Sequence, residues 1–87
     1  LQFKVTARRN KLLGLWAAGK IGLTGDAAAA YAKEVVVSDF DEPGDKDVLR
    51  KLLQDFSKKN VDINEHAVRR EMERLFEQAK QEVAKEI

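Results

Sequence analysis

The sequence predicts an all-α fold, a small bundle of four helices. Apolar residues recur at steps of three and four along most of the chain, which is the spacing of one face of a helix. Short stretches rich in glycine, proline, asparagine and aspartate divide the chain into four such segments. Its 87 residues suffice for one domain with one modest core. We therefore expect a single domain, residues 1–87, with helices at about 1–20, 25–40, 46–59 and 65–86 that pack as antiparallel neighbours.

The first segment is amphipathic when it is drawn as a helix. With about 100° between successive residues, one arc of it is apolar and collects Leu1, Val5, Leu12, Leu15 and Trp16. We expect Leu12, Leu15 and Trp16 to anchor the bundle. Small residues form a narrow strip on another side, where a neighbouring helix can come close, and they are Ala7, Gly14 and Ala18. Gly19 and Gly22 are expected to end the helix, because glycine takes the left-handed conformation without a steric penalty.

The second segment, residues 25–40, begins after Thr24, which is a suitable N-cap. Its alanine run favours helix, whereas Val35, Val36 and Val37 favour strand. A single strand would have no partner in this chain, so we expect a helix throughout. Because the segment is apolar almost all round, we expect it to lie centrally and to contact several neighbours.

The last two segments have the clearest helical patterns. Residues 46–59 follow Asp45 as an N-cap and precede Asn60, which suits a left-handed C-terminal position. Two starts of residues 65–86 are equally consistent with the pattern, namely Asp62 with Glu65 as a capping box, or Asn64 as the cap. The expected core residues are Val48, Leu49, Leu52, Leu53 and Phe56 in the third segment and Val68, Met72, Leu75, Phe76, Ala79, Val83 and Ile87 in the fourth.

The net charge of +1 conceals a strong asymmetry. The first 20 residues carry five basic side chains and no acid, whereas residues 21–47 carry seven acids against two basic residues. Such a chain pairs its own halves or presents two differently charged faces to partners. The pI of about 8.2 is too low for a typical nucleic-acid-binding domain, so we expect no nucleic-acid partner.

The composition excludes several classes of site. The chain has no cysteine, hence neither disulfides nor thiolate metal ligands, which fits a reducing compartment such as the cytoplasm. No run of about 18 apolar residues is present that could span a membrane. His66, the only histidine, is expected to be a solvated residue of a first helical turn, because no metal-ligand spacing surrounds it. The scattered hydroxyl groups form no catalytic dyad with a base, so we expect no enzyme.

The basic cluster Arg8-Arg9-Asn10-Lys11 is the best candidate for a binding site. Arg9 projects into the apolar arc, where an unpaired charge is costly, so it must reach the edge or meet a carboxylate. One interpretation is that the cluster pairs internally with an acid from Asp39, Asp41, Asp45, Asp47 and Asp55. The other is that it binds an anionic, phosphate-bearing ligand, with Trp16 as a stacking partner. Arg8 and Lys11, at the edge of the apolar arc and beyond it, are expected to be free for a partner.

Several motifs of the chain resemble those of one known family. The stretch from Ala7 to Ala18, ARRNKLLGLWAA, is similar to the signature of the α-proteobacterial ATPase-inhibitor zeta-subunit family. The likeness continues through AYAKEVV at residues 30–36, DFDEPGD at 39–45 and VRREM at 68–72, and so covers nearly the whole chain. The first motif is quite specific, whereas the last is generic for a helix. Lys20 and Val37 depart from the family pattern without seriously weakening the match.

The resemblance implies a four-helix protein that binds the catalytic head of F-type ATP synthase and blocks ATP hydrolysis by inserting an N-terminal segment into that head. In the family this segment lies upstream of Leu1, so we expect an N-terminally truncated anchoring bundle that keeps only the trailing edge, Leu1-Gln2-Phe3-Lys4. We expect a monomeric, cytoplasmic regulatory protein without membrane insertion. The residues expected to contact the partner are Leu1, Phe3, Lys4, Arg8 and Lys11.

Nucleotide binding is also associated with the family, which implies a weak ADP or ATP site near the basic helix and no other cofactor. Its expected residues are Arg8, Arg9, Lys11 and Trp16. A small adenine-nucleotide-binding regulatory module is therefore the alternative function. A nucleic-acid-binding helical domain is a third hypothesis, and the many acids argue against it.

Overall fold

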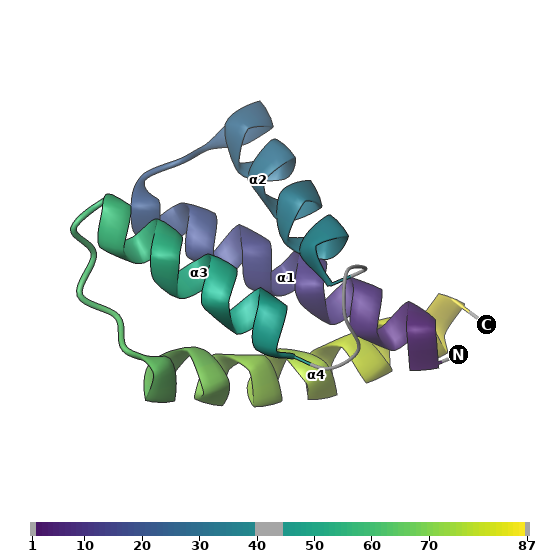
Figure 1. Cartoon of the computed structure of the whole chain (residues 1–87). Coiled ribbons are helices and arrows are strands. Elements are labelled where there is room, and N and C mark those ends of the chain that lie inside the picture. The colour runs from purple at the N-terminus through teal and green to yellow at the C-terminus, as the bar shows by residue number, and fades with distance from the viewer. Residues whose placement is uncertain (1, 40–44, 87) are drawn as a thin grey trace.

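The computed structural model of the chain, which describes residues 2–39 and 45–86, contains four α-helices (Figure 1). The all-α class is confirmed, and the described residues include no strand, so Val35–Val37 is helical as expected. The predicted ends at Leu1, Phe40 and Ile87 lie outside the described residues. The helices are α1 Gln2–Ile21, α2 Gly25–Ser38, α3 Lys46–Lys58 and α4 Glu65–Glu86.

The helix α1 occupies the centre of the bundle. Among the described residues it contacts each of the other three helices, whereas α2 contacts only α1 and α3. The prediction that residues 25–40 form the central helix is therefore wrong. Alanine favours helix wherever it stands, and Ala27, Ala29 and Ala30 of α2 are exposed to solvent. The apolar appearance of α2 reflected helix propensity more than burial.

Successive helices run in opposite directions, as the short connections predict. Asp45 at the start of α3 lies beside Arg9, and Phe56 near its end lies against Trp16, so α3 is parallel to α1. The α4 helix returns along α1, with Ala79 and Val83 packed on Val5. The N-terminal end of α1 therefore lies next to the C-terminal end of α4 (Figure 1).

The buried side of α1 differs from the predicted arc. Leu13 and Ala17 are fully buried, and Leu12 and Trp16 are partly buried against the core, but Leu15 is 39% exposed. The expectation that Leu15 anchors the bundle is therefore wrong. Because α1 is packed on several sides, burial extends from most of the apolar arc to the strip of small residues, and Leu15, at one edge of the arc, lies outside the buried side.

The strip of small residues on α1 admits α2, as expected. A Cβ atom on Gly14 would lie 2.6 Å from the Cα of Ala32 and 3.2 Å from the Cβ of Val35. Ala18 is fully buried and Ala7 is partly buried on the same strip. The close approach of α2 to α1 therefore depends on the missing side chain at position 14.

Left-handed residues end two of the helices. Gly22 has a φ of 89°, and the N–H of Leu23 donates to the carbonyl of Ala18 at 2.8 Å, which closes α1. Gly19 lies inside α1, so only one of the two expected glycines terminates it. Asn60 has a φ of 58° and ends α3 as predicted.

Fewer helices begin with a side-chain hydrogen bond from the N-cap residue than the sequence predicts. Asn64 caps α4, because its Oδ1 accepts a hydrogen bond from the N–H of Ala67 at 2.9 Å. Thr24 and Asp45 occupy the N-cap positions of α2 and α3, but neither side chain bonds to its own helix. The carboxylate of Asp45 is directed to Arg9 instead.

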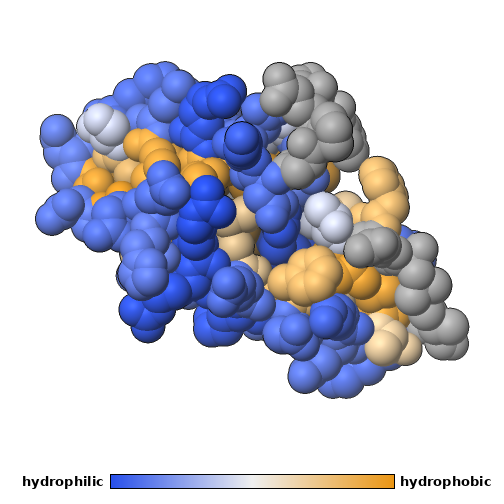
Figure 2. Space-filling model, turned by 60° about the horizontal axis from the view of Figure 1, so that its bottom comes forward, coloured by the Kyte–Doolittle hydropathy of each residue, from blue (hydrophilic) through white to orange (hydrophobic). Residues whose placement is uncertain are grey.

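Solvent-facing surfaces are largely hydrophilic. On the face drawn in Figure 2, hydrophobic surface gathers in two main areas with hydrophilic side chains between them. Within residues 2–39 and 45–86, no helix combines the length and apolarity that a membrane crossing requires.

Candidate functional site

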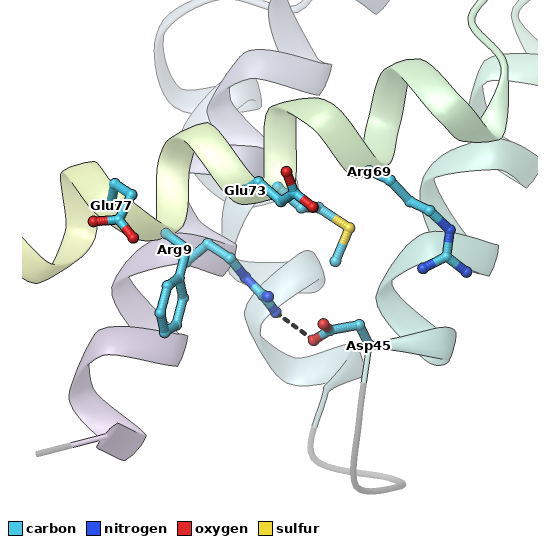
Figure 3. A pocket seen from close by; sticks show the side chains of 7 residues that line it. Arg9, Asp45, Arg69, Glu73 and Glu77 are labelled. Carbon is cyan, nitrogen blue, oxygen red and sulfur yellow. Dashed lines mark hydrogen bonds and ion pairs between the residues drawn. The ribbon is translucent and has the colours of Figure 1, made fainter.

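The basic cluster of α1 is divided between two sides of the helix, and Arg9 is its buried member. The side chain is only 6% exposed, and its Nη2 donates to Oδ1 of Asp45 at 2.9 Å. Figure 3 shows the guanidinium of Arg9 directed at Asp45, and the side chains of Arg69 and Glu73 on α4 lie nearby. The expectation that Arg9 meets a carboxylate of a neighbouring helix is confirmed. Because the Asp45 side chain is 52% exposed, the pair keeps one partner in contact with water.

Asn10 is the second acceptor for Arg9, and sequence reasoning missed it. Its Oδ1 receives hydrogen bonds from Nε of Arg9 at 2.9 Å and from Nη2 at 2.7 Å, and the residue is 1% exposed. A buried charged group needs several acceptors to replace its hydration. An asparagine next to an arginine inside an amphipathic helix was the available signal, because an asparagine gains little from such a position unless its amide is bonded.

Asp39, at the C-terminal end of α2, lies against this cluster. Within the part of the chain that the structure describes, its buried Oδ1 has no hydrogen-bond partner. Burial raises the pKa of Asp39, and the negative charges of Asp45 and Asp47 act in the same direction. Hydrogen bonding with Asn10 and the charge of Arg9 oppose that rise without cancelling it. The ionised carboxylate is therefore poorly accommodated in the folded protein.

We expect Asp39→Asn to be more stable than the wild type at pH 7. The pKa of Asp39 is higher in the folded protein than in the unfolded chain. In the pH window between these two pKa values, the folded state therefore binds more protons than the unfolded state. The free energy of unfolding contributed by this group therefore falls as pH rises through the window and is highest below about pH 3.9, the unfolded value. Urea unfolding from pH 3 to pH 7 tests this. The difference between the two proteins should grow with pH, and an identical pH profile for both would contradict the assignment.

A pocket of about 540 Å³ opens beside the Arg9–Asp45 pair (Figure 3). It is lined by Arg9, Asp45, Arg69, Met72, Glu73, Phe76 and Glu77. Among the described residues, its lining holds two basic side chains, Arg9 and Arg69, and three acidic ones, Asp45, Glu73 and Glu77, and no group of three or more potential metal ligands is placed to hold an ion. His66 is exposed in the first turn of α4, as expected. The pocket therefore has the character of a partly solvated site beside one ion pair, Arg9–Asp45.

The other acids considered as partners of the basic cluster have different roles. Asp55 accepts hydrogen bonds from the Tyr31 hydroxyl at 2.7 Å and from Lys51 Nζ at 3.1 Å. Burial, followed by the bond to Asp55, raises the pKa of Tyr31. Asp47 pairs with Arg50 on its own helix. Asp41 lies outside the described residues.

Arg8 connects the two ends of the chain. Its Nη1 lies 2.9 Å from Oε1 of Glu82, and its Nη2 pairs with Glu86, so both partners come from α4. A hydrogen bond from Gln78, followed by the bond from Arg8, lowers the pKa of Glu82. The expectation that Arg8 is free is therefore wrong. Its guanidinium fixes the beginning of α1 on the end of α4, and its contribution to partner binding stays a prediction.

Four of the five residues predicted to contact a partner line a single pocket of about 300 Å³. The fifth, Leu1, lies outside the described residues. Phe3 is 70% exposed, and Lys4 and Lys11 are also exposed. The described residues that line it are Phe3, Lys4, Ala7, Arg8, Lys11, Val36, Val83 and Glu86.

A second pocket of about 260 Å³ continues the first one along α1 and α2. The two share Lys11 and Val36, so we treat them as one depression, which we call the α1/α2 groove. The second pocket is lined by Lys11, Leu15, Ala29, Ala32, Lys33 and Val36. The sequence analysis found Lys11 but not the α2 residues of the groove. The strip of small residues around Gly14 predicts that some helix packs closely on α1, but it does not predict that this helix is α2.

The residues predicted to bind a nucleotide are spread over three places. Arg9 lines the pocket beside Asp45, whereas Arg8 and Lys11 line the α1/α2 groove. Trp16 is partly buried and packs edge-on against Phe56, with ring centroids 5.9 Å apart. Nucleotide binding at these residues stays a prediction.

Comparisons with known proteins agree with the resemblance found in the motifs. A family model described as ATPase inhibitor subunit zeta matches residues 1–82. A solved structure described as the solution NMR structure of a protein is 49% identical to this chain, with a TM-score of 0.87. That alignment covers 99% of this chain and 98% of the other. A comparison with curated proteins gave no match.

Proposed function

Because the chain belongs to the ATPase inhibitor subunit zeta family, we propose that it is a monomeric, cytoplasmic regulatory subunit of F-type ATP synthase. In this proposal an N-terminal helical segment inserts into the catalytic head and sterically prevents the closure that ATP hydrolysis requires. The four-helix bundle anchors and orients that segment. The observation that carries the proposal is the exposure of Phe3 and Lys4 at the beginning of α1, where both line one pocket.

A steric wedge has to be rigid, and the contacts of α1 support this requirement. The helix has 20 residues and so spans about 30 Å. Val5 packs on Ala79 and Val83, and Arg8 pairs with Glu82 and Glu86. Force on the first turn of α1 is therefore passed to α4 and then to the whole bundle.

We expect Phe3→Ala combined with Lys4→Ala to weaken inhibition of ATP hydrolysis by about tenfold or more, equivalent to about 1.4 kcal/mol of binding. Both side chains are exposed, so their removal should leave the bundle folded. The measurement is ATP hydrolysis by the isolated catalytic head, titrated with each protein in a form extended upstream of Leu1, because the 87-residue chain is expected to inhibit poorly. Lys58→Ala with Lys59→Ala, exposed at the far end of α3, is the control and should inhibit like the wild type. Undiminished inhibition by the Phe3 and Lys4 variant would contradict the proposed wedge.

The role of a segment preceding α1 has its own test. We expect the 87-residue chain to inhibit poorly and a form extended by the native residues upstream of Leu1 to inhibit strongly. The same titration compares the two proteins at equal concentration. Equal inhibition by both would show that the bundle and the start of α1 suffice without a further segment.

A further inference from the structure

We propose that the α1/α2 groove binds an acidic amphipathic helix of the partner. The inference rests on the proposed function, because it assigns the partner helix to the catalytic head. It adds to the N-terminal wedge a docking surface that shares Phe3 and Lys4 with it and extends along α1 and α2 as far as Leu15 and Lys33. Three properties of the groove support it, namely its shape, its apolar lining and its excess positive charge.

The shape follows from the way in which α2 crosses α1. Figure 1 shows α2 inclined to α1, and the two backbones are close together where Ala32 lies on Gly14. Helices that are inclined to each other diverge away from such a contact, which leaves a depression between them. Phe3 and Leu15, at its two ends on α1, are twelve positions apart, or about 18 Å along the helix axis. This length accommodates about three turns of a partner helix.

The lining of the groove provides apolar contact area. Ala7, Ala32 and Val36 contribute apolar atoms between the two helices. Leu15 is 39% exposed and Phe3 is 70% exposed, and both line the groove. Exposed large apolar side chains gathered in one depression are characteristic of a surface that a partner covers.

The charge of the groove indicates the character of that partner. Lys4, Lys11 and Lys33 line it, and none of them forms an ion pair with any residue within 2–39 and 45–86. Some basic residues elsewhere on the surface, such as Arg69 and Arg74, are paired with acids of their own helix, whereas the groove gathers three lysines that have no such partner among the described residues. Among the described residues of the lining, the single acid is Glu86, which is already paired with Arg8. An incoming helix with carboxylates beside its apolar stripe would satisfy the lysines and cover Leu15.

The test compares two charge-reversed proteins in binding to the isolated catalytic head. The groove variant is Lys11→Glu with Lys33→Glu, and the control is Lys58→Glu with Lys59→Glu, which makes the same change of charge at exposed positions of another helix. We expect the groove variant to bind about tenfold more weakly or worse, with a smaller dependence on salt. The control should stay within about twofold of the wild type. Circular dichroism and thermal unfolding verify that both variants fold.

A photo-crosslinking side chain at position 15 identifies the occupant in the same complex. We expect it to label an acidic helix of the catalytic head. Labelling of a second copy of this chain, or of a segment without acidic residues, overturns the inference, and so does unchanged binding by the groove variant. If both variants bind and inhibit like the wild type, the groove inference fails while the proposed function stands. A wild-type chain that does not bind the head overturns both.

Discussion

Replacing Gly14 by valine is expected to lower the free energy of unfolding by about 3 kcal/mol, the upper part of the range for overpacked cores. The atom that a Cβ at this position would meet is the Cα of Ala32, only 2.6 Å away. A backbone atom cannot rotate aside, so α2 as a whole would have to move off α1. Even Gly14→Ala should destabilise the protein, although alanine is worth about 1 kcal/mol more than glycine in a helix interior.

Gly19→Ala is the matched control for this experiment. It lies in the same helix and is exposed, and nothing stands within 4 Å of a Cβ built there. We expect it to raise the free energy of unfolding by up to about 1 kcal/mol. Urea titration of the three proteins measures both effects. Stabilisation by both alanine substitutions would mean that α2 does not approach α1 as closely as the 2.6 Å distance indicates.

Asn10→Ala is expected to cost about 2–3 kcal/mol of stability, because hydrogen bonds to charged groups lie at the high end of their range. The substitution removes the acceptor of two bonds from Arg9 and leaves the buried guanidinium with Asp45 alone. Lys11→Ala, at the adjacent exposed position, should change stability by no more than about 0.5 kcal/mol.

A double variant separates the cost of the buried charge from the cost of lost packing. Arg9→Met with Asn10→Leu replaces the charge and its buried acceptor by apolar side chains and leaves the other acceptor, the half-exposed Asp45, to be hydrated. Such replacements are often neutral or stabilising, whereas removal of one partner is not. We therefore expect the double variant to be more stable than Asn10→Ala in chemical denaturation. If it is less stable, the Arg9–Asn10–Asp45 contacts contribute more than the desolvation of Arg9 costs.

Local signals predict the helices of this protein well. The spacing of Val48, Leu52 and Phe56 in α3, and of Val68 and Met72 in α4, depends only on the helical repeat, and all five residues are buried. The same applies to the left-handed position of Asn60. For α4, the sequence is consistent with two N-terminal caps, Asp62 and Asn64. The hydrogen bond from the Ala67 N–H to the Asn64 side chain identifies Asn64 as the cap.

Features that depend on the packing of whole helices could not be predicted in the same way. Leu15 is exposed because of where the neighbouring helices pack on α1. A local sequence pattern does not predict the positions of those neighbours. Part of the candidate site was predictable, because Arg9 in an apolar arc requires a carboxylate. The α1/α2 groove was not predictable, because Lys11 of α1 and Lys33 of α2 come together in it only through the way in which the two helices pack. The pairing of Arg8 likewise requires knowledge of which chain end lies beside α1.

The contact between Arg8 and Glu82 has a consequence for the synthesis and folding of the protein. The two residues are 74 positions apart, so their pairing closes nearly the whole chain into a loop. Contacts of such long range form late and slow the search for the native topology. During synthesis, the first turn of α1 lacks its packing partner until α4 has left the ribosome. The beginning of α1, which is proposed to act on the enzyme, is thus made well before the helix that holds it in place.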